Sequence, residues 1–267
     1  MKFTKMHGIG NDYIFINCLN QTVENISATT KFLSNRHFGI GSDGVVLILP
    51  SLIADFKMDI YNSDGSRAEM CGNAIRCIGK YVYDNTLINK KEVTIETLSG
   101  LKTLQLHTKE SVVWSATVDM GVPVFNTDIN DPYEIDGKTY NMTCVSMGNP
   151  HAVIFIDSDV NTFDVHGIGR IIENSKGFPN RTNVEFANII NKNTINMRVW
   201  ERGAGETLAC GTGACAVLCA AVTKGLCDRL ATICLPGGNL SIVWNDSDDH
   251  IYMTGTTTKV FDGEIIF

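Results

Sequence analysis

The pattern of hydrophobic and polar positions in the first half of the chain predicts strands interrupted by two helices. A segment dense in turn-forming residues, 62–70, predicts a loop, and from Gly72 apolar residues recur at helical spacing until Asp84. Cys71 therefore lies at the start of this predicted helix. The other predicted elements are a short helix at 28–36 and strands at 2–7, 12–17, 45–49, 56–61, 92–97, 101–107 and 112–119.

The second half of the chain repeats this order of elements. A loop at 202–209 again leads to a cysteine, Cys210, and to a helix over 211–224 that Gly225 ends. This helix is apolar on every face over 214–222, which is typical of a helix buried on all sides. Strands are predicted at 139–147, 152–157, 183–190 and 194–201, with three or four more after the helix, joined by turns at 236–238 and 245–249.

Landmarks of the two halves recur at a nearly constant offset, which is the sequence signature of a structural repeat. Cys71 and Cys210 are 139 positions apart, and Asn11 and Asn149 are 138 positions apart. We therefore expect two similar α/β domains that face each other. The pairs Gly44 with Asn183 and Asn62 with Glu201 keep the same spacing.

The length of the chain agrees with two domains. Its 267 residues are about 1.8 times the roughly 150 residues of a typical domain. We place an N-terminal domain at 1–118, joined by a C-terminal strand at 258–267, and a C-terminal domain at 119–257.

Composition and charge exclude several classes of function. A formal net charge of −7 without a basic cluster argues against binding to nucleic acid or to anionic membranes. The longest apolar run, 214–222, has nine residues, whereas a membrane-spanning helix needs about 20. The odd number of nine cysteines and the absence of an export signal predict free thiols in a cytoplasmic protein.

The two cysteines at helix starts suggest a specific chemistry. A thiol at a helix N-terminus is stabilised as thiolate by unsatisfied N–H groups and by the helix dipole. Pseudo-twofold symmetry would place Cys71 and Cys210 on opposite faces of one substrate carbon, where one removes the Cα proton and the other delivers one. Backbone N–H groups around Gly72 and Gly211 would bind the substrate carboxylate. No pyridoxal-phosphate lysine and no cluster of metal ligands is recognisable in the sequence, so we expect no cofactor and no metal.

The motifs of this chain resemble those of the diaminopimelate epimerase family, pyridoxal-phosphate-independent enzymes that interconvert LL- and meso-diaminopimelate in lysine and cell-wall precursor biosynthesis. The resemblance implies an α/β fold of the α+β type, with two pseudo-symmetric domains that each wrap a mixed β-sheet or barrel around a central helix. It also implies a homodimer that acts on a small molecule. The matching segments are Phe3–Asp12, Asn62–Ser66, Met70–Asn73, Met147–His151, Glu201–Thr207, Ala209–Gly213 and Phe261–Gly263.

The resemblance assigns roles to particular residues. Cys71 and Cys210 become the two acid/base thiols, and His151 and Glu201 resemble a family pair near the first thiol. That pair would take up a proton or meet the substrate ammonium group, and the sequence leaves the division of these roles open. The substrate-binding residues assigned in this way are Asn11, Asn62, Gly72, Asn73, Asn149, Asn183, Glu201, Arg202, Gly211 and Thr212.

Two positions depart from the family pattern. Gly44 stands where many members carry Gln, so the contact made by that amide should be absent, replaced by water, or supplied by a neighbour such as Ser42. Ala74 replaces a frequent Gly inside the helix, a change of one methyl group that we expect to be tolerated.

Three other functions remain open on the sequence alone. One is a racemase of the same fold that acts on proline, hydroxyproline or another amino acid. A second is a thiol redox or peroxide-sensing protein that uses Cys71 and Cys210. A third is a non-catalytic module that binds an amino acid, which would exchange no Cα proton.

Overall fold

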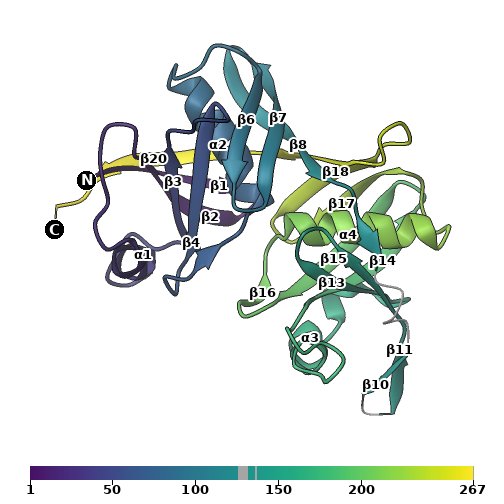
Figure 1. Cartoon of the computed structure of the whole chain (residues 1–267). Helices are drawn as coiled ribbons and strands as arrows, with labels where there is room; N and C mark the ends of the chain where they lie inside the picture. Colours follow the sequence, from purple (N-terminus) through teal and green to yellow (C-terminus); the bar gives the residue numbers. More distant parts are fainter. Residues whose placement is uncertain (126–131, 136, 267) are drawn as a thin grey trace. The chain divides into compact units, whose positions relative to one another are not determined.

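A computed structural model describes residues 1–125, 132–135 and 137–266 of the chain. The chain divides into two compact units: unit 1 comprises Met1–Asp119 with Thr254–Phe267, and unit 2 comprises Met120–Met253. Phe267, the last residue of the predicted C-terminal strand, lies outside the described residues. Each unit is built around one mixed β-sheet and one buried helix (Figure 1).

Unit 1 contains a mixed sheet in the order β20-β1-β2-β3-β4-β6-β7-β8. The pairs β2/β3 and β4/β6 are parallel, the other pairs are antiparallel, and the short β5 pairs with β4. The strands are β1 (Lys2–Gly8), β2 (Asn11–Asn17), β3 (Gly44–Leu49), β4 (Phe56–Asn62), β5 (Arg67–Ala68), β6 (Glu92–Thr97), β7 (Gly100–Lys109), β8 (Val112–Gly121) and β20 (Thr258–Glu264).

The central helix of unit 1 is α2 (Gly72–Asp84), and the sheet curves around it. The helix contacts β1 and β2 as well as β7, which lie far apart in the order of strands. Its residues Ile75 and Ile78 are fully buried, which places the apolar face of the helix inside the curved sheet.

A second helix of unit 1, α1 (Ile26–Ser34), contacts β3 and β4. It begins and ends two residues earlier than the sequence predicted. The early end has a local cause: the side-chain oxygen of Asn35 accepts hydrogen bonds from the backbone N–H groups of His37 and Phe38, both at 2.9 Å. These bonds turn the chain out of the helix, as asparagine commonly does.

Unit 2 repeats the plan of unit 1. Its sheet has the order β9-β12-β13-β14-β15-β17-β18, with parallel pairs β13/β14 and β15/β17. The strands are β9 (Val124–Phe125), β10 (Tyr133–Ile135), β11 (Lys138–Tyr140), β12 (Met142–Ser146), β13 (Pro150–Phe155), β14 (Asn183–Asn191), β15 (Thr194–Glu201), β16 (Gly205–Thr207), β17 (Leu230–Leu235), β18 (Gly238–Trp244) and β19 (Ile251–Thr256), which leads back to unit 1.

The central helix of unit 2 is α4 (Gly211–Thr223), which contacts β12, β13, β14, β17 and β18. Residues Gly213–Ala221 of this helix are buried, and most of them are small. Small side chains let a helix approach the surrounding strands closely on every side. The prediction of a helix buried all round is therefore confirmed.

Helix α3 (Val165–Glu173) of unit 2 was not predicted. It starts 139 positions after α1 starts and has the same length, nine residues. Applying the repeat offset to the helix predicted at 28–36 would have indicated it. The side chain of Asp164 caps α3 by accepting the backbone N–H of Gly167 at 2.8 Å.

The remaining differences from the predicted elements are small. The strand expected at 139–147 is divided into β11 and β12, and the loops before the two cysteines contain the short strands β5 and β16. The predicted fold class, a mixed architecture with a sheet around a central helix in each half, is confirmed. In the described part of the chain, no helix has the length and apolar character needed to cross a membrane.

Candidate active site

Cys71 begins the central helix of unit 1 and is surrounded by amide side chains. It is the N-cap residue of α2, in an extended backbone conformation with φ −137° and ψ 117°. Its thiol donates to the side-chain oxygen Oδ1 of Asn11 at 3.3 Å, and Nδ2 of Asn73 donates to the same oxygen at 3.4 Å. The structure therefore brings together Asn11, Cys71, Gly72 and Asn73, four of the predicted site residues.

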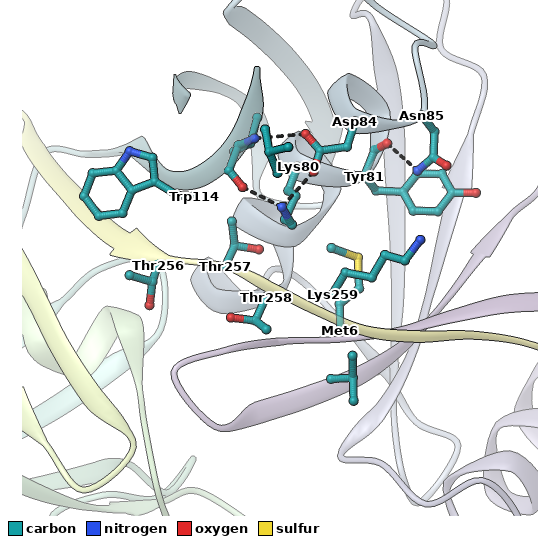
Figure 2. Close-up of a pocket in the computed structure, with 13 residues that line it drawn as sticks. Met6, Lys80, Tyr81, Asp84, Asn85, Trp114, Thr256, Thr257, Thr258 and Lys259 are labelled. Carbon is teal, nitrogen blue, oxygen red and sulfur yellow. Dashed lines mark hydrogen bonds and ion pairs between the residues drawn. The ribbon is translucent and has the colours of Figure 1, made fainter. Parts of the chain in front are cut away.

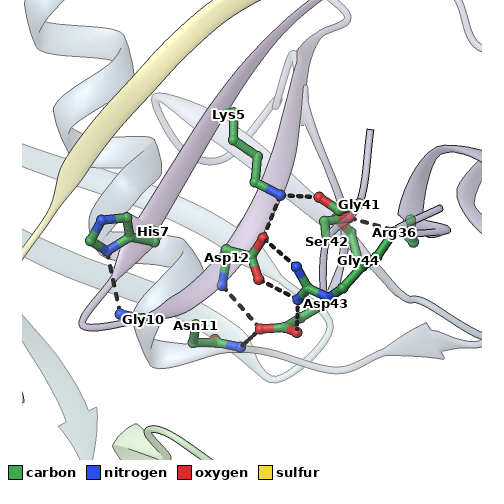
Figure 3. A network of polar contacts seen from close by, with 11 residues as sticks. Lys5, His7, Gly10, Asn11, Asp12, Arg36, Gly41, Ser42, Asp43 and Gly44 are labelled. Atoms are coloured by element: carbon green, nitrogen blue, oxygen red, sulfur yellow. Dashed lines mark hydrogen bonds and ion pairs between the residues drawn. The ribbon is translucent and has the colours of Figure 1, made fainter. Parts of the chain in front are cut away.

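Asp43 holds the amide of Asn11 in this orientation (Figure 3). Its carboxylate oxygen Oδ2 accepts from Nδ2 of Asn11 at 2.8 Å and from the backbone N–H of Asp12 at 3.0 Å. Because the amide nitrogen of Asn11 is committed to Asp43, the amide oxygen must face Cys71. Asp43 is not among the site residues predicted from the sequence, although it is the only carboxylate in the glycine-rich segment 39–44.

Asp12 and Asp43 share one cation but differ in their acidity. Arg36 donates to Asp12 at 2.7 Å and to Asp43 at 2.9 Å, while Lys5 pairs with Asp12 and also donates to the backbone oxygen of Gly41 (Figure 3). Burial opposes ionisation of Asp12, but hydrogen bonds from Arg36 and Lys5 outweigh it and lower the pKa of Asp12. For Asp43, burial and the charge of Asp12 outweigh the donors and raise the pKa.

Asn62 ends β4, where it lies opposite Gly44 in the register of β3 and β4. Its side chain is exposed, and Nδ2 donates to the hydroxyl of Ser66 at 3.1 Å. A Cβ atom at Gly44 would lie 2.0 Å from the backbone oxygen of Tyr61, so the backbone here has no room for a side chain. Ser42 does not replace the family glutamine, because its buried hydroxyl donates to the oxygen of Gly44 at 2.9 Å.

Cys210 begins the central helix of unit 2 in a backbone conformation close to that of Cys71, with φ −125° and ψ 111°. Its sulfur lies 3.6 Å from the hydroxyl oxygen of Thr212, and the backbone N–H of Gly213 donates to it. Its thiol also shares a hydrogen bond with the carboxylate of Glu201. The resemblance placed Glu201 near the first thiol, whereas within unit 2 its sulfur partner is the second.

The helix start lowers the pKa of the Cys210 thiol through the N–H of Gly213, but other effects are larger. Burial, followed by the negative charges of Glu201 and Glu185, raises the pKa of this thiol well above its ordinary value. These effects outweigh the hydrogen bonds from Thr212 and Gly213. Burial and the neighbouring charge of Glu185 also raise the pKa of Glu201, despite its hydrogen bonds with Thr207 and Cys210. Cys210 therefore rests as a thiol beside a carboxylate of increased basicity.

His151 lies in the same unit and is entirely buried. Its ring nitrogen Nδ1 is 2.6 Å from Oε1 of Glu185, whose side chain is also fully buried. The other nitrogen, Nε2, lies 3.1 Å from Oδ1 of Asn149, and Nδ2 of Asn149 donates to the hydroxyl of Thr212 at 3.3 Å. Unit 2 thus gathers Asn149, His151, Glu201, Cys210, Gly211 and Thr212 around the start of α4.

Asn183 and Arg202 are linked through the backbone. Oδ1 of Asn183 accepts the backbone N–H of Arg202 at 2.9 Å, and Nδ2 donates to the backbone oxygen of Pro150 at 2.9 Å. The buried amide of Asn183 thereby fixes the turn that carries Glu201 and Arg202. The side chain of Arg202 is exposed.

A pocket of about 700 Å³ in unit 1 is lined by residues of α2, β8 and β20 and by none of the predicted site residues (Figure 2). Within it, Nζ of Lys80 donates to Asp84 at 2.7 Å and to the backbone oxygen of Val113 at 2.5 Å. Val112, Trp114 and Val260 on its rim are about half exposed. Among the described residues, no group of three or more His, Cys, Asp or Glu side chains is arranged to hold a metal ion.

A comparison of the chain with models of protein families identifies its family. The model of the diaminopimelate epimerase family matches residues 3–126 and 143–260. The chain belongs to the diaminopimelate epimerase family. Diaminopimelate epimerases of Methanococcus maripaludis and Acetivibrio thermocellus are each 55% identical to it over 276 residues, with 99% of this chain covered and 99% and 98% of theirs.

Solved structures of other racemases share the fold. A probable proline racemase from Agrobacterium radiobacter K84 superposes with a TM-score of 0.75 at 14% identity, covering 99% of this chain and 92% of that one. A hydroxyproline epimerase from Agrobacterium vitis superposes with a TM-score of 0.74 at 13% identity, covering 99% and 90%. At such low identity the likeness shows a common architecture.

The family inferred from the motifs is therefore confirmed, and with it the prediction of an isomerase that epimerises diaminopimelate. The two-cysteine mechanism and the roles of the individual residues stay predictions.

Proposed function

We propose that this chain interconverts LL- and meso-diaminopimelate by moving protons at Cα with Cys71 and Cys210, without a cofactor. Inversion of a tetrahedral carbon requires that one proton leave from one face and another arrive at the opposite face, so it needs one base and one acid. The observation that carries the proposal is the equivalence of the two thiols: each is the N-cap residue of a 13-residue central helix.

Backbone amides at the helix starts support the stabilisation of the reacting carboxylate. The Cα–H bond of an amino acid is weakly acidic, so charge that develops on the carbanion and its carboxylate must be stabilised. Gly72 and Gly211 each occupy the first position of a helix, where backbone N–H groups lack helical acceptors. Such donors contribute about 3–4 kcal/mol each when they face developing negative charge.

Glu201 provides a route for the proton of Cys210. For Cys210 to act as a base, its thiol proton moves to the hydrogen-bonded carboxylate of Glu201, and the resulting thiolate takes the Cα proton. In the reverse direction the thiol gives its proton to the carbanion and recovers one from Glu201. The raised pKa of Glu201 makes its carboxylate a stronger base and supports this exchange.

The polar residues outside the helix starts fit the far end of the substrate. Diaminopimelate has a second amino-acid end that does not react. The exposed guanidinium of Arg202 can hold the carboxylate of that end with two parallel hydrogen bonds. We propose that Asn183 contributes by fixing the backbone of Arg202, and that Asn62 contributes from the end of β4.

We further propose that units 1 and 2 are the two domains of the enzyme and that it works as a homodimer in the cytoplasm. The exposed apolar side chains of Val112, Trp114 and Val260 on the pocket rim support a dimer surface in unit 1. The nine thiols support a reducing compartment. Analytical ultracentrifugation of the wild type and of Trp114→Glu tests the dimer: a monomeric wild type contradicts it.

Deuterium exchange tests the mechanism. In heavy water the wild type should place deuterium on the substrate Cα while it epimerises LL-diaminopimelate, with proline as the control substrate that should not react. Cys71→Ala and Cys210→Ala should each abolish epimerisation. Full activity in either variant, or a preference for proline, would contradict the proposal. Thiol–disulfide turnover without deuterium exchange would favour a redox protein.

A further inference from the structure

Two buried titratable residues in unit 2, His151 and Glu185, form a pair whose purpose the proposed mechanism does not yet explain. Strands β13 and β14 run parallel, with His151 opposite Asn183 and Val153 opposite Glu185. Because side chains alternate along a strand, His151 and Glu185 lie on the same face of the sheet, on the side covered by α4. Their contact between Nδ1 and Oε1 measures 2.6 Å, and both side chains are 0% exposed.

A glycine of α4 makes room for this carboxylate. A Cβ atom at Gly213 would lie 2.6 Å from Oε1 of Glu185 and 3.3 Å from the sulfur of Cys210. The glycine thus lets a carboxylate and a thiol approach the same point of the helix. Cys210 therefore has two carboxylates in its surroundings, those of Glu201 and Glu185.

Glu185 differs from a buried carboxylate with a purely structural function. In the same unit, Oε2 of Glu173 accepts from the indole nitrogen of Trp200 at 2.7 Å, and Oε1 accepts from the backbone N–H of Gly203 at 2.9 Å. Oε2 of Glu185, in contrast, is buried without a hydrogen-bond partner among the described residues. Within this part of the chain the carboxylate makes one side-chain hydrogen bond, to His151, and a buried carboxylate with one such partner is expected to act on that partner.

Both ring nitrogens of His151 face oxygen atoms. Thr212 accepts from Nδ2 of Asn149, so the amide oxygen of Asn149 is the atom that faces Nε2 of His151 at 3.1 Å. An amide oxygen accepts a hydrogen bond, and so does an ionised carboxylate, so with Glu185 ionised and Asn149 in this orientation each ring nitrogen donates. The form of the ring that satisfies both contacts is then the imidazolium cation.

We propose that Glu185 is a positioning residue that keeps His151 as an imidazolium and thereby fixes the hydrogen-bond direction from His151 through Asn149 to Thr212 beside Cys210. This inference rests on the proposed role of Cys210 as one of the two acid/base thiols. With Asn149 held in this orientation, its Nδ2 donates to the oxygen of Thr212, so the hydroxyl proton of Thr212 is left to point towards the sulfur at 3.6 Å. A donor in that direction stabilises the thiolate that forms when Cys210 acts as a base.

The charges that surround His151 agree with a cation at this place. Glu185 on β14 contacts the ring directly, and the charges of Glu185 and His151 both act on Glu201 at the end of β15. The charge of Glu185 also raises the pKa of two thiols, that of Cys144 on β12 and that of Cys210 at the start of α4. If His151 were neutral, the other titratable groups of this cluster would be carboxylates and thiols, which carry a negative charge when they ionise.

Nitrogen NMR of the histidine rings tests the proposal directly. In protein labelled with ¹⁵N-histidine, both ring nitrogens of His151 should carry protons in the wild type, with its signals assigned by their absence in His151→Asn. In Glu185→Gln the amide oxygen still accepts from Nδ1, but without the negative charge Nε2 should lose its proton, and the amide of Asn149 should turn so that its Nδ2 donates to this nitrogen. Glu173→Gln removes a different buried carboxylate from unit 2 and should leave both nitrogens of His151 protonated.

Kinetics provide the second measurement. Glu185→Gln should lower kcat by about tenfold or more, the loss typical of removing a partner that orients a functional imidazole, with KM changed little. Glu206→Gln, whose carboxylate pairs with Arg198, should retain the wild-type kcat.

Two results overturn the inference: an unprotonated ring nitrogen of His151 in the wild type, or two protonated nitrogens together with normal kcat in Glu185→Gln. The wild-type spectrum alone shows whether His151 is an imidazolium, even if Glu185→Gln does not fold. If the protein does not exchange the Cα proton of diaminopimelate, the proposed function fails, and the NMR result for the pair remains a separate outcome.

Discussion

Cys71 and Cys210 begin α2 and α4 in nearly the same extended conformation, but their thiols meet different hydrogen-bonding partners. Cys71 donates to the neutral amide oxygen of Asn11, whereas Cys210 shares a hydrogen bond with the carboxylate of Glu201. The repeat therefore gives the two sulfurs one backbone geometry and two electrostatic environments. A two-base epimerase can use this difference to tune each proton transfer separately.

The charge of Glu201 should control the acidity of Cys210. Burial is the largest cause of the raised pKa of Cys210, and Glu201 is the next. In Glu201→Gln the negative charge is gone, the thiolate is less disfavoured, and the pKa of Cys210 should fall. The pH dependence of alkylation of Cys210 by iodoacetamide, followed by mass spectrometry, should therefore move to lower pH.

The control for this measurement is Glu206→Gln, which removes a carboxylate without contact to Cys210 and should leave the alkylation profile in place. Cys77 and Cys144, whose burial raises the pKa to about 11, should remain unmodified in both variants at pH 8. An unchanged profile for Cys210 in Glu201→Gln would contradict the assignment of Glu201 as its electrostatic partner.

Asp43 should affect catalysis through the amide of Asn11. In Asp43→Ala, Nδ2 of Asn11 loses its acceptor, so the amide oxygen is no longer held towards Cys71, and kcat should fall by about tenfold or more. Asp43→Asn is the matched control because its side-chain oxygen can still accept from Asn11 and from the backbone N–H of Asp12. Steady-state kinetics should show a clearly smaller loss for Asp43→Asn, and equal losses would argue for a structural effect alone.

Asp12 should contribute stability that depends on pH. Its pKa is lowered in the folded protein because hydrogen bonds from Arg36 and Lys5 outweigh the effect of burial. A lowered pKa means that the contribution is present above the unfolded value of 3.8 and is lost as the pH falls through the folded value. Asp12→Asn should therefore lower the free energy of unfolding at pH 7 by about 1.5–3 kcal/mol, as for other hydrogen bonds to charged groups.

Urea unfolding at several pH values checks this expectation. The difference between wild type and Asp12→Asn should shrink as the pH is lowered below 3.8, because Asp12 becomes protonated in the wild type as well. A difference that stays constant across the acid range would show that the contribution does not come from the ionised carboxylate.

Gly44 should be intolerant of side chains. Its Cβ position is 2.0 Å from the backbone oxygen of Tyr61 and 2.9 Å from the ring of Tyr13, so even Gly44→Ala forces β3 and β4 apart. We expect a loss of about 1–3 kcal/mol in the free energy of unfolding, the usual effect of overpacking. Gly100→Ala, where nothing lies within 4 Å but φ is +94°, measures backbone strain alone. A fully stable Gly44→Gln would show that the strands adapt to the family residue.

The sequence by itself determined most of the elements, their repetition and the family, but not helix α3. Hydrophobic periodicity located the central helices, because a helix packed against a sheet has apolar residues at helical spacing. This spacing can be read from a short stretch of sequence. The position of Cys71 and Cys210 at helix starts followed from the turn-rich loops before them. The motifs around the two thiols were specific enough to identify the epimerase family, and they are confirmed by the family model across both halves.

The tertiary structure alone decided the electrostatics of each thiol. Asp43 lies 28 residues before Cys71 and Glu185 lies 25 residues before Cys210, and neither belongs to the segments that resemble the family. Parallel pairing of β13 and β14 nevertheless brings Oε1 of Glu185 to 2.6 Å from Nδ1 of His151. A pKa depends on burial and on charges brought close by folding, which is why the helix start alone does not set the pKa of Cys210. Local sequence specifies where a thiol sits on its helix, and long-range packing specifies whether it holds its proton.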